Sequence, residues 1–533
     1  MEGTAGLIKS GAGALVLTGA NTVAGAVTIT GGTLQIGSDG ALGNAANDIA
    51  NNGTLKTTSD IALGAGRDIT GSGTLDIANG TTLTVNGVTS TSGLTLANTG
   101  TLAFNNAASN PGNLTTTYTS GTARVTGNLN LGATDKIVNV AGGGALEVAG
   151  TVSLTTGAGT ELTKEGAGTL ILSGSGSSIS RVQIGRTGAT PTAGGTLRVA
   201  DSASLGAQEM YFNYGTLEAA NNLSTSAGVS LGGRTGAETI IGGSGGSADV
   251  TFNGAARFFG ATGTGGEFAL KVNNNTTLAG GISGAAGTRT GVTLGGAGTL
   301  NITGNSAAFT DRIITSDTVK LVVNSSLGSA VNVGNGSLLG GSGSVGALTL
   351  STGATLTPGN SPGLLTATSA TFQSGSNLNW EIFNAVGTAG VEWDLLSVTG
   401  NLNVAALSSG SMNLVLNSLS ALPNTVGALA GFNSNDTYSW TFARAASITG
   451  ATGVLTSGQD VTSLFSINGT SFNLGTAPTS DWKVMTGTET VGGTTYQTLN
   501  LMAVPEPSAQ SLLAFGMAAL VAVRAARRGR GNS

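Results

Sequence analysis

The tripeptide Gly-Thr-Leu recurs along this chain and limits the folds that the chain can adopt. It begins at Gly32, Gly53, Gly73, Gly100, Gly168, Gly195, Gly215 and Gly298. Its leucines lie 21 residues apart from Leu34 to Leu55 and 20 residues apart from Leu55 to Leu75. Around them apolar and other residues alternate, as in Leu75 and Ile77, and a period of two is typical of a strand with one buried face. Short strands that return every ~20 residues indicate a solenoid, in which each turn stacks on the one before.

Asn-Gly pairs separate the expected strands and leave one alternative open. They occur, for example, at Asn52-Gly53, Asn79-Gly80 and Asn86-Gly87. Both residues accept positive φ, so the chain can turn sharply there. Because Asn-Gly is also a strong hairpin signal, a β-sandwich or a propeller is the alternative. The return of Gly-Thr-Leu after insertions of unequal length favours an all-β, right-handed parallel β-solenoid.

The amino-acid composition excludes several classes of functional site. The 533 residues include no Cys and no His, which excludes zinc sites built from these residues, Ser–His–Asp catalysis, thiol catalysis and disulfides. The formal charge is −5, and without the four arginines of the last ten residues it is −9. Because phosphate contacts need clustered Lys and Arg, we expect no nucleic-acid partner. We also expect no cofactor.

The composition changes near residue 372. All four Trp residues lie beyond this point, and Pro358 and Pro362 lie just before it, where proline interrupts a regular strand ladder. We therefore predict a β-solenoid over 1–372 and a less repetitive β-rich cap over 373–503. Such a cap would cover an open solenoid end, which otherwise invites pairing with other chains.

Residues 504–533 form a tail of a different kind. Pro505, Glu506 and Pro507 precede an apolar segment, for which we predict a membrane helix that includes Leu512, Leu513, Phe515, Met517, Leu520, Val521 and Val523. With its small residues the segment extends from 508 to 526, close to the ~20 residues that a bilayer requires. A basic cluster follows, formed by Arg524, Arg527, Arg528 and Arg530, and we expect it to stay in the cytoplasm. The alternative is a buried helix of another domain.

Two segments resemble the autotransporter-associated β-strand repeat. Residues 7–19 read LIKSGAGALVLTG and residues 162–174 read LTKEGAGTLILSG, and both share Leu, Lys, Gly, Ala, Gly, Leu, Leu and Gly at matching positions. We place the repeats at about 7–43 and 162–206, with a degraded copy at 295–328. The segment TLTPGNSPGLL is similar to one often found near the end of the passenger domains that contain this repeat. The resemblance implies the passenger domain of a bacterial surface protein, usually β-helical.

The tail resembles a PEP-CTERM sorting signal. Its three parts are Pro505-Glu506-Pro507, the apolar segment and the Arg-rich end, and they occur in that order. The resemblance implies that an exosortase-type membrane enzyme recognises and cleaves the chain in a Gram-negative bacterium that produces exopolysaccharide. It also implies an intermediate anchored in the inner membrane before the protein reaches the cell surface or the medium.

Export also requires an N-terminal signal peptide, with a basic start, an apolar core and a cleavage site. The first residues, MEGTAGLIKSGAG, have none of these features and are already repeat-like. We therefore expect the coding sequence to extend upstream of Met1.

Four further patterns in the sequence are candidates for functional sites. Asp311, Arg312, Asp317 and Lys320 form a compact charged cluster, for which exposed turn residues are favoured over a sugar-cleaving pair of carboxylates. Gly341, Gly343 and Gly346 match a dinucleotide fingerprint, but a strand-like segment follows instead of a helix. Asp76 is isolated from any tandem calcium motif. Trp393 and Asp394 suit a sugar-stacking site, although a Trp that fills the core of a cap is favoured.

The function favoured by the sequence is non-catalytic. We expect an exported surface or extracellular-matrix protein of adhesin type, sorted through its tail and in weak, repeated contact with exopolysaccharide or neighbouring cells. The alternative is a β-helical polysaccharide lyase or hydrolase. A charged groove would favour the enzyme, and a surface of Thr, Ser and Asn would favour the adhesin.

Overall fold

The computed structural model describes residues 1–154, 160–186, 194–206, 209–233, 238–243, 248–260, 267–283, 291–433, 435–472 and 480–505. The chain divides into two compact units, Met1–Val331 and Asn332–Ser533, here called unit 1 and unit 2. The strand β40 (Val331–Val333) contains the point of division.

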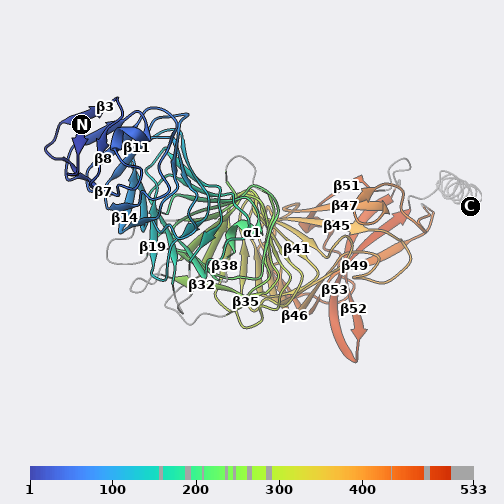
Figure 1. The fold of residues 1–533 in the computed structure, drawn as a ribbon. Coiled ribbons are helices and arrows are strands. Elements are labelled where there is room, and N and C mark those ends of the chain that lie inside the picture. Colours follow the sequence, from blue (N-terminus) through green and yellow to red (C-terminus); the bar gives the residue numbers. More distant parts are fainter. Residues whose placement is uncertain are drawn as a thin grey trace, which may run out of the picture. The chain divides into compact units, whose positions relative to one another are not determined.

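Unit 1 consists of short strands arranged in four main sheets, here named I to IV (Figure 1). Sheet I contains β2 (Leu7–Lys9), β5 (Val27–Ile29), β7 (Ile49–Asn51), β10 (Ile69–Gly71) and β13 (Thr89–Thr91). Sheet II contains β3 (Ala14–Leu17), β6 (Thr33–Ile36), β8 (Thr54–Thr57), β11 (Thr74–Ile77), β14 (Gly93–Leu96), β16 (Asn113–Thr116), β19 (Lys136–Asn139), β22 (Leu162–Glu165), β24 (Arg181–Ile184), β26 (Glu209–Phe212), β29 (Gly228–Gly233), β32 (Ala256–Gly260) and β35 (Ile282–Ser283).

The other strands of unit 1 follow the same pattern. Sheet III contains β9 (Ile61–Ala62), β12 (Thr82–Val85), β15 (Thr101–Phe104), β17 (Thr122–Thr126), β20 (Ala145–Val148), β23 (Thr169–Leu172), β25 (Thr196–Val199), β27 (Gly215–Ala219), β30 (Thr239–Ile241), β33 (Phe268–Val272), β36 (Val292–Gly295) and β38 (Ile313–Thr315). Sheet IV contains β28 (Leu223–Thr225), β31 (Val250–Phe252), β34 (Asn275–Leu278), β37 (Thr299–Ile302) and β39 (Lys320–Val323). Two short strand pairs lie outside these sheets: β1 (Glu2–Gly3) with β4 (Thr22–Val23), and β18 (Leu129–Asn130) with β21 (Val152–Ser153). The unit also contains the one-turn helices η1 (Asp39–Leu42) and α1 (Ser202–Leu205).

Strands of successive turns pair in parallel and in register, which confirms the predicted parallel β-solenoid. Leu34 on β6 lies opposite Leu55 on β8, and Leu55 lies opposite Leu75 on β11. All three side chains are almost fully buried. They form an interior column, because parallel pairing in register places each inward side chain directly over its equivalent in the next turn. The handedness stays a prediction.

The Gly-Thr-Leu strands do not all belong to one sheet, which the sequence did not indicate. Those of Leu34, Leu55 and Leu75 lie in sheet II; those of Leu102, Leu170, Leu197 and Leu217 lie in sheet III; and that of Leu300 lies in sheet IV. The motif specifies a corner followed by a half-buried strand, and every sheet of a solenoid needs such strands. Insertions between repeats therefore move the motif from one sheet to another without changing its local structure.

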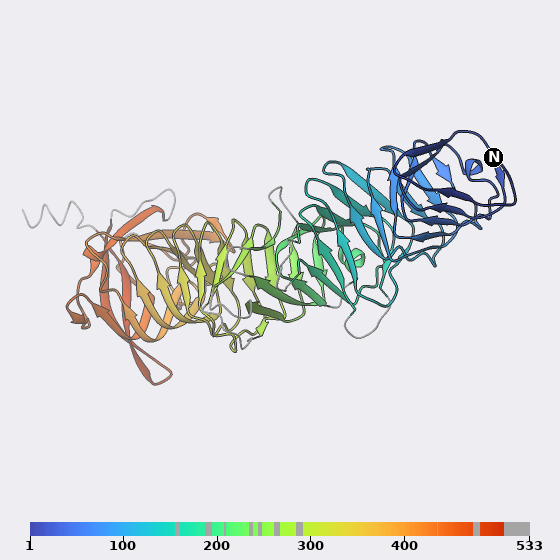
Figure 2. The same ribbon diagram turned by 90° about the vertical axis from the view of Figure 1, so that its left-hand side faces the viewer.

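Unit 2 contains longer strands in two sheets, here named V and VI (Figure 2). Sheet V contains β42 (Ser344–Leu350), β44 (Leu364–Phe372), β46 (Leu395–Asn403), β49 (Tyr438–Gly450), β50 (Gly453–Val454), β52 (Ser480–Val491) and β53 (Thr494–Pro505). Sheet VI contains β41 (Leu338–Gly341), β43 (Thr355–Pro358), β45 (Asn377–Ile382), β47 (Met412–Ala421), β48 (Thr425–Val426) and β51 (Phe465–Ser471), and the short helix η2 (Thr462–Leu464) precedes β51.

Parallel pairing continues in unit 2 beyond residue 372, from β44 to β46 and from β46 to β49. The pattern then changes, because β53 pairs antiparallel with both β49 and β52. The β52–β53 hairpin extends away from the rest of unit 2 in both views (Figures 1 and 2). The division at 331/332 differs from the compositional change at 372, and the predicted segment boundaries at 372 and 503 stay predictions.

Replacing Leu55 by Asp should destabilise the turns around it. The substitution places an unpaired charge in the interior column, at a cost of several kcal/mol. We expect hydrogen exchange to accelerate in peptides that cover β6, β8 and β11. The control is Thr54→Asp, which adds the same charge at the outward-facing position beside Leu55 and should change exchange far less. Equal effects of the two substitutions would contradict the interior column.

Candidate functional site

The predicted sorting tail lies almost entirely outside the described residues. The strand β53 ends at Pro505, whose backbone pairs with that of Ser480. Glu506, Pro507 and the apolar and Arg-rich segments that follow are outside the described part of the chain. Among the described residues, no helix has the length and apolar character needed to cross a bilayer. The sorting motif, the membrane helix and the basic anchor therefore stay predictions.

Two residues of the charged cluster at 311–320 contact earlier turns of the solenoid. Arg312 forms an ion pair with Glu267 of an earlier turn, at 2.7 Å. Asp317, whose φ is 57°, accepts a hydrogen bond from the Gly296 backbone N–H. Arg312 thus reaches across two turns and Asp317 reaches the preceding turn, and both lie outside the strands, which agrees with the favoured interpretation as turn residues.

Trp393 and Asp394 are buried and offer no surface for stacking against a sugar. The Trp393 indole N–H donates to the Thr441 carbonyl at 3.0 Å, and the Asp394 side chain is fully buried. This confirms the favoured interpretation of Trp393 as a core residue.

The two remaining patterns are also structural. Gly341 ends the strand β41, and Gly346 lies within the next strand, β42. The helix that a dinucleotide site requires is therefore replaced by a strand. Asp76 forms an ion pair of 2.6 Å with Lys56, which lies opposite it on the neighbouring strand.

A buried lysine in each of the two closer repeats is a feature that the sequence analysis missed. Lys9 on β2 and Lys164 on β22 occupy the same position of the repeat, and both side chains are buried. The Lys9 ammonium donates to the carbonyls of Ser10, Gly11 and Gly31 at 2.8, 2.8 and 2.9 Å. Strand alternation could have drawn attention to it, because Lys9 shares the inward face of β2 with Leu7.

Lys164 makes the same three contacts in the second repeat. Its ammonium donates to the carbonyls of Glu165, Gly166 and Gly194 at 2.7, 2.8 and 2.9 Å. Burial lowers the pKa of Lys164 to about 7, although the nearby Glu165 carboxylate acts in the opposite direction. Each lysine thus joins the corner after its own strand to a glycine that belongs to a later corner. The two repeats thus use a lysine at the same inward position in the same way.

The glycines of the repeat allow the backbone segments of these corners to approach one another closely. Gly32 has a φ of 65°, and a Cβ atom there would lie 2.3 Å from the Gly11 carbonyl oxygen and 2.6 Å from the Lys9 ammonium. Gly195 has a φ of 54°, and its Cβ would lie 2.4 Å from the Gly166 carbonyl oxygen. Only glycine adopts this conformation at so close an approach. Each lysine and the glycine pair that it contacts therefore form one structural element, here called the lysine corner. The first consists of Lys9, Gly31 and Gly32, and the second consists of Lys164, Gly194 and Gly195.

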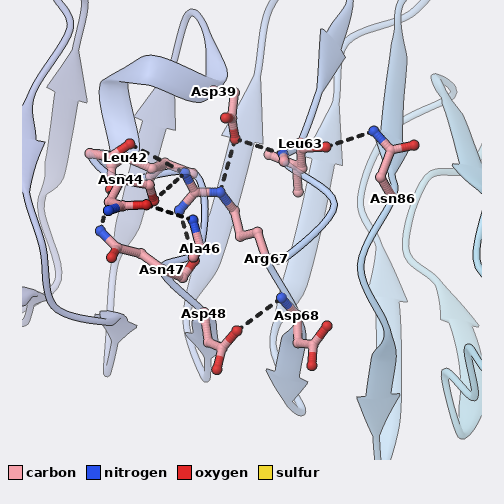
Figure 3. Close-up of polar contacts among 12 residues, drawn as sticks. Asp39, Leu42, Asn44, Ala46, Asn47, Asp48, Leu63, Arg67, Asp68 and Asn86 are labelled. Atoms are coloured by element: carbon pink, nitrogen blue, oxygen red, sulfur yellow. Dashed lines mark hydrogen bonds and ion pairs between the residues drawn. The ribbon is translucent and has the colours of Figure 1, made fainter.

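Arg67 holds another corner in the same way (Figure 3). Its guanidinium is fully buried and forms an ion pair of 2.9 Å with Asp39 of the helix η1. It also donates to the carbonyls of Asn47 and Asn44, at 2.8 and 3.0 Å. A rigid fork of N–H donors can serve several acceptors at once, which suits Arg to this position.

The outward faces of unit 1 carry charges that are paired from turn to turn. Lys56 lies opposite Asp76, Arg124 opposite Glu147, and Arg181 opposite Glu209. Their ion-pair distances are 2.6, 3.6 and 3.0 Å. Each partly exposed pair contributes little stability. The pairing matters in another way, because carboxylates of this chain already neutralise these cations.

A column of threonines runs along sheet II. Thr33, Thr54, Thr74, Thr95 and Thr115 occupy equivalent positions on β6, β8, β11, β14 and β16 and lie opposite one another in register. All five side chains are partly exposed. Neighbouring strands are about 4.8 Å apart, so the hydroxyl groups repeat at that spacing. This column is a hydroxyl-bearing surface of the kind that the sequence analysis associated with an adhesin.

Replacing Lys164 by Met should weaken the second lysine corner, because buried carbonyls lose their donor. A cost of about 1–3 kcal/mol is typical of a buried polar group left without a partner. Hydrogen exchange should accelerate in peptides around 162–172 and 194–199. The control Lys56→Met removes a partly exposed ion pair and should cost at most about 1 kcal/mol. If Lys164→Met exchanged as slowly as the wild type, the lysine corner would not stabilise the repeat.

The comparisons with known proteins identify the same repeats. The passenger-associated transport repeat family matches residues 7–36 and 162–199. These ranges contain both lysine corners, and they confirm the two closer repeats expected from the sequence. The degraded copy expected at 295–328 is not part of the match.

A curated relative shares part of this chain. The adhesin BmaC autotransporter of Brucella suis biovar 1 (strain 1330) is 44% identical over 88 residues, which cover 16% of this chain and 3% of the adhesin. The matched segment thus spans only a small part of that relative. The chain is a β-solenoid protein in which two segments match the passenger-associated transport repeat family.

Proposed function

We propose that this protein is an exported, non-catalytic adhesin of the cell surface or extracellular matrix. Its proposed ligands are uncharged, hydroxyl-rich polymers such as exopolysaccharide, or the surfaces of neighbouring cells. The observation that carries the proposal is the threonine column of sheet II, on a solenoid in which two segments match an autotransporter-type repeat. The similarity to a protein described as an adhesin supports it.

The geometry of the column suits weak contacts made many times. Each hydroxyl group can donate and accept one or more hydrogen bonds, and the regular spacing presents the same group to successive units of a polymer. Linked weak contacts reach a high total affinity because each bound group holds the next one close to its partner. The turn-to-turn ion pairs beside the column reduce its attraction for charged ligands.

We further propose that the protein reaches its destination through its C-terminal tail. In this scheme the apolar segment holds an intermediate in the inner membrane of a Gram-negative bacterium, and an exosortase-type enzyme cleaves near Pro505-Glu506-Pro507. The order of the three parts in the sequence, Pro505-Glu506-Pro507, the apolar segment and the Arg-rich end, supports the scheme.

Removing hydroxyl groups from the threonine column should weaken adhesion. The variant Thr54→Val, Thr74→Val, Thr95→Val keeps the β-branched shape and the strand preference. We expect retention of the full chain on exopolysaccharide from the producing strain to fall several-fold. The matched control replaces the same three residues by Ser, which keeps the hydroxyl groups and should retain binding. Failure of the wild-type chain to bind exopolysaccharide or cells would contradict the proposed function.

Changing Pro505-Glu506-Pro507 to Ala-Ala-Ala should block processing in the native host. Mass spectrometry of the wild-type protein should find a mature C-terminus near Pro505, whereas the variant should remain in the membrane fraction with its Arg-rich end intact. The control is a variant with Ser480→Ala, opposite Pro505 on the hairpin, which should be processed normally. A wild-type protein that is free outside the cell and still contains Arg530 would contradict the sorting scheme.

A further inference from the structure

Unit 2 contains a carboxyl group that is fully buried where the strand β46 begins. Asp394 directly precedes β46, and its side chain has no solvent exposure. One carboxyl oxygen accepts the backbone N–H of Gly363 at 2.9 Å, and the other accepts that of Glu381 at 3.0 Å. Asp394 therefore joins the loop that precedes β44 to the strand β45.

A second carboxyl group lies beside it. Glu381 on β45 is partly buried, and its carboxyl group is hydrogen-bonded to the hydroxyl of Ser361. The same hydroxyl contacts the side chain of Asn424, in the turn between β47 and β48. The pair Asp394 and Glu381, here called the acid pair, thus contacts the loop 359–363 through Gly363 and Ser361.

No described cation neutralises the acid pair. The loop 359–363, the strands β44 and β46 and the turn at 422–424 contain no charged residue, and β45 contributes only Glu381 itself. In the segment before Asp394, Glu392 accepts the Thr388 backbone N–H. Arg444 on β49 is held by Glu489 at 2.7 Å and by the hydroxyl of Ser397. The nearest charges are therefore either like-signed or already paired.

These surroundings favour the protonated acids. Burial raises the pKa of Asp394 well above its usual value, and the nearby Glu381 carboxylate raises it further, while the two backbone N–H groups act in the opposite direction. Burial also raises the pKa of Glu381, against the hydrogen bond from Ser361. An acid whose pKa is higher in the folded than in the unfolded state stabilises the fold in acid. That stability is lost as the pH rises through the folded pKa.

We propose that the acid pair is a pH-dependent fastening of unit 2: in acid it holds the loop 359–363 against β45 and β46, and toward neutral pH it releases that loop. The basis is geometric, because two carboxyl groups without a cation hold one loop through Gly363 and Ser361. An exported protein meets surroundings of varying pH, but this fastening does not depend on the proposed adhesive function.

Tryptophan fluorescence of the full chain provides a local test. All four Trp residues lie between 380 and 482, so their emission reports on unit 2. The Trp380 indole also donates to the Asp394 backbone carbonyl at 2.8 Å. Urea unfolding at pH 4.5 and 7.5 is compared for the wild type, Asp394→Asn and Glu381→Gln. Exchange of the peptide 359–365, corrected for the intrinsic effect of pH, follows the loop directly.

The expected result is a difference in pH dependence between variants. From pH 4.5 to 7.5, the folded-to-unfolded ratio of the wild type should fall at least about tenfold more than that of Asp394→Asn. The reason is that each unit by which folding raises a pKa corresponds to a factor of ten in this ratio. Asp394→Asn should be less stable in acid, because its amide nitrogen cannot accept one of the two N–H groups. Glu381 lies nearer the surface than Asp394, so the variant Glu381→Gln tests the proposal if Asp394→Asn does not fold.

The control is Glu392→Gln, two residues from Asp394, which should keep the pH dependence of the wild type. Loop exchange in the wild type should accelerate at pH 7.5, and this acceleration should shrink in Glu381→Gln. The proposal is overturned if Asp394→Asn and Glu381→Gln show the same pH dependence as the wild type. It is also overturned if loop exchange is equally slow at both pH values.

Discussion

The structure of unit 1 depends on one constraint: the inward side chains of each turn are covered only when another turn stacks on them in register. A strand of three or four residues buries too little apolar surface to be stable alone. Leu34, Leu55 and Leu75 become buried together because parallel hydrogen bonding places each over the next. The register, the periodicity and the core are therefore one property, and a charge at any of these positions affects more than one turn.

The corners present a different problem, because backbone carbonyls that turn inward lose contact with water. The two repeats solve it with a long cation that reaches three carbonyls at once, in Lys9 and again in Lys164. Arg67 serves the corner around Asn44 and Asn47 in the same manner. A buried cation is costly unless its hydrogen-bonding capacity is used. Here the carbonyls and the ammonium satisfy one another.

These internal solutions leave the outward faces free to vary. Outward positions contribute little to the core, so threonine columns and turn-to-turn ion pairs occupy them without disturbing the stack. The proposed adhesive role uses this freedom, since a ligand would contact side chains that the fold does not require. Unit 2 differs, because Asp394 and Glu381 place ionisable groups within the packed structure, where protonation and folding are linked.

Much of the fold of unit 1 is determined by the sequence itself. The alternation around each Gly-Thr-Leu and its return every ~20 residues predict short parallel strands, because both are local patterns that only stacked turns can bury. Other features depend on residues that meet only in the folded chain. The distribution of the motif over three sheets depends on the summed length of the insertions. The partners of Lys164 and Arg67 include carbonyls up to 30 residues away in the sequence. Asp394 contacts Gly363 and Glu381 only after β44, β45 and β46 have packed, and Glu381 then also contacts Ser361. Only the tertiary structure decides such contacts, because composition and spacing carry no information on which polar groups become buried side by side.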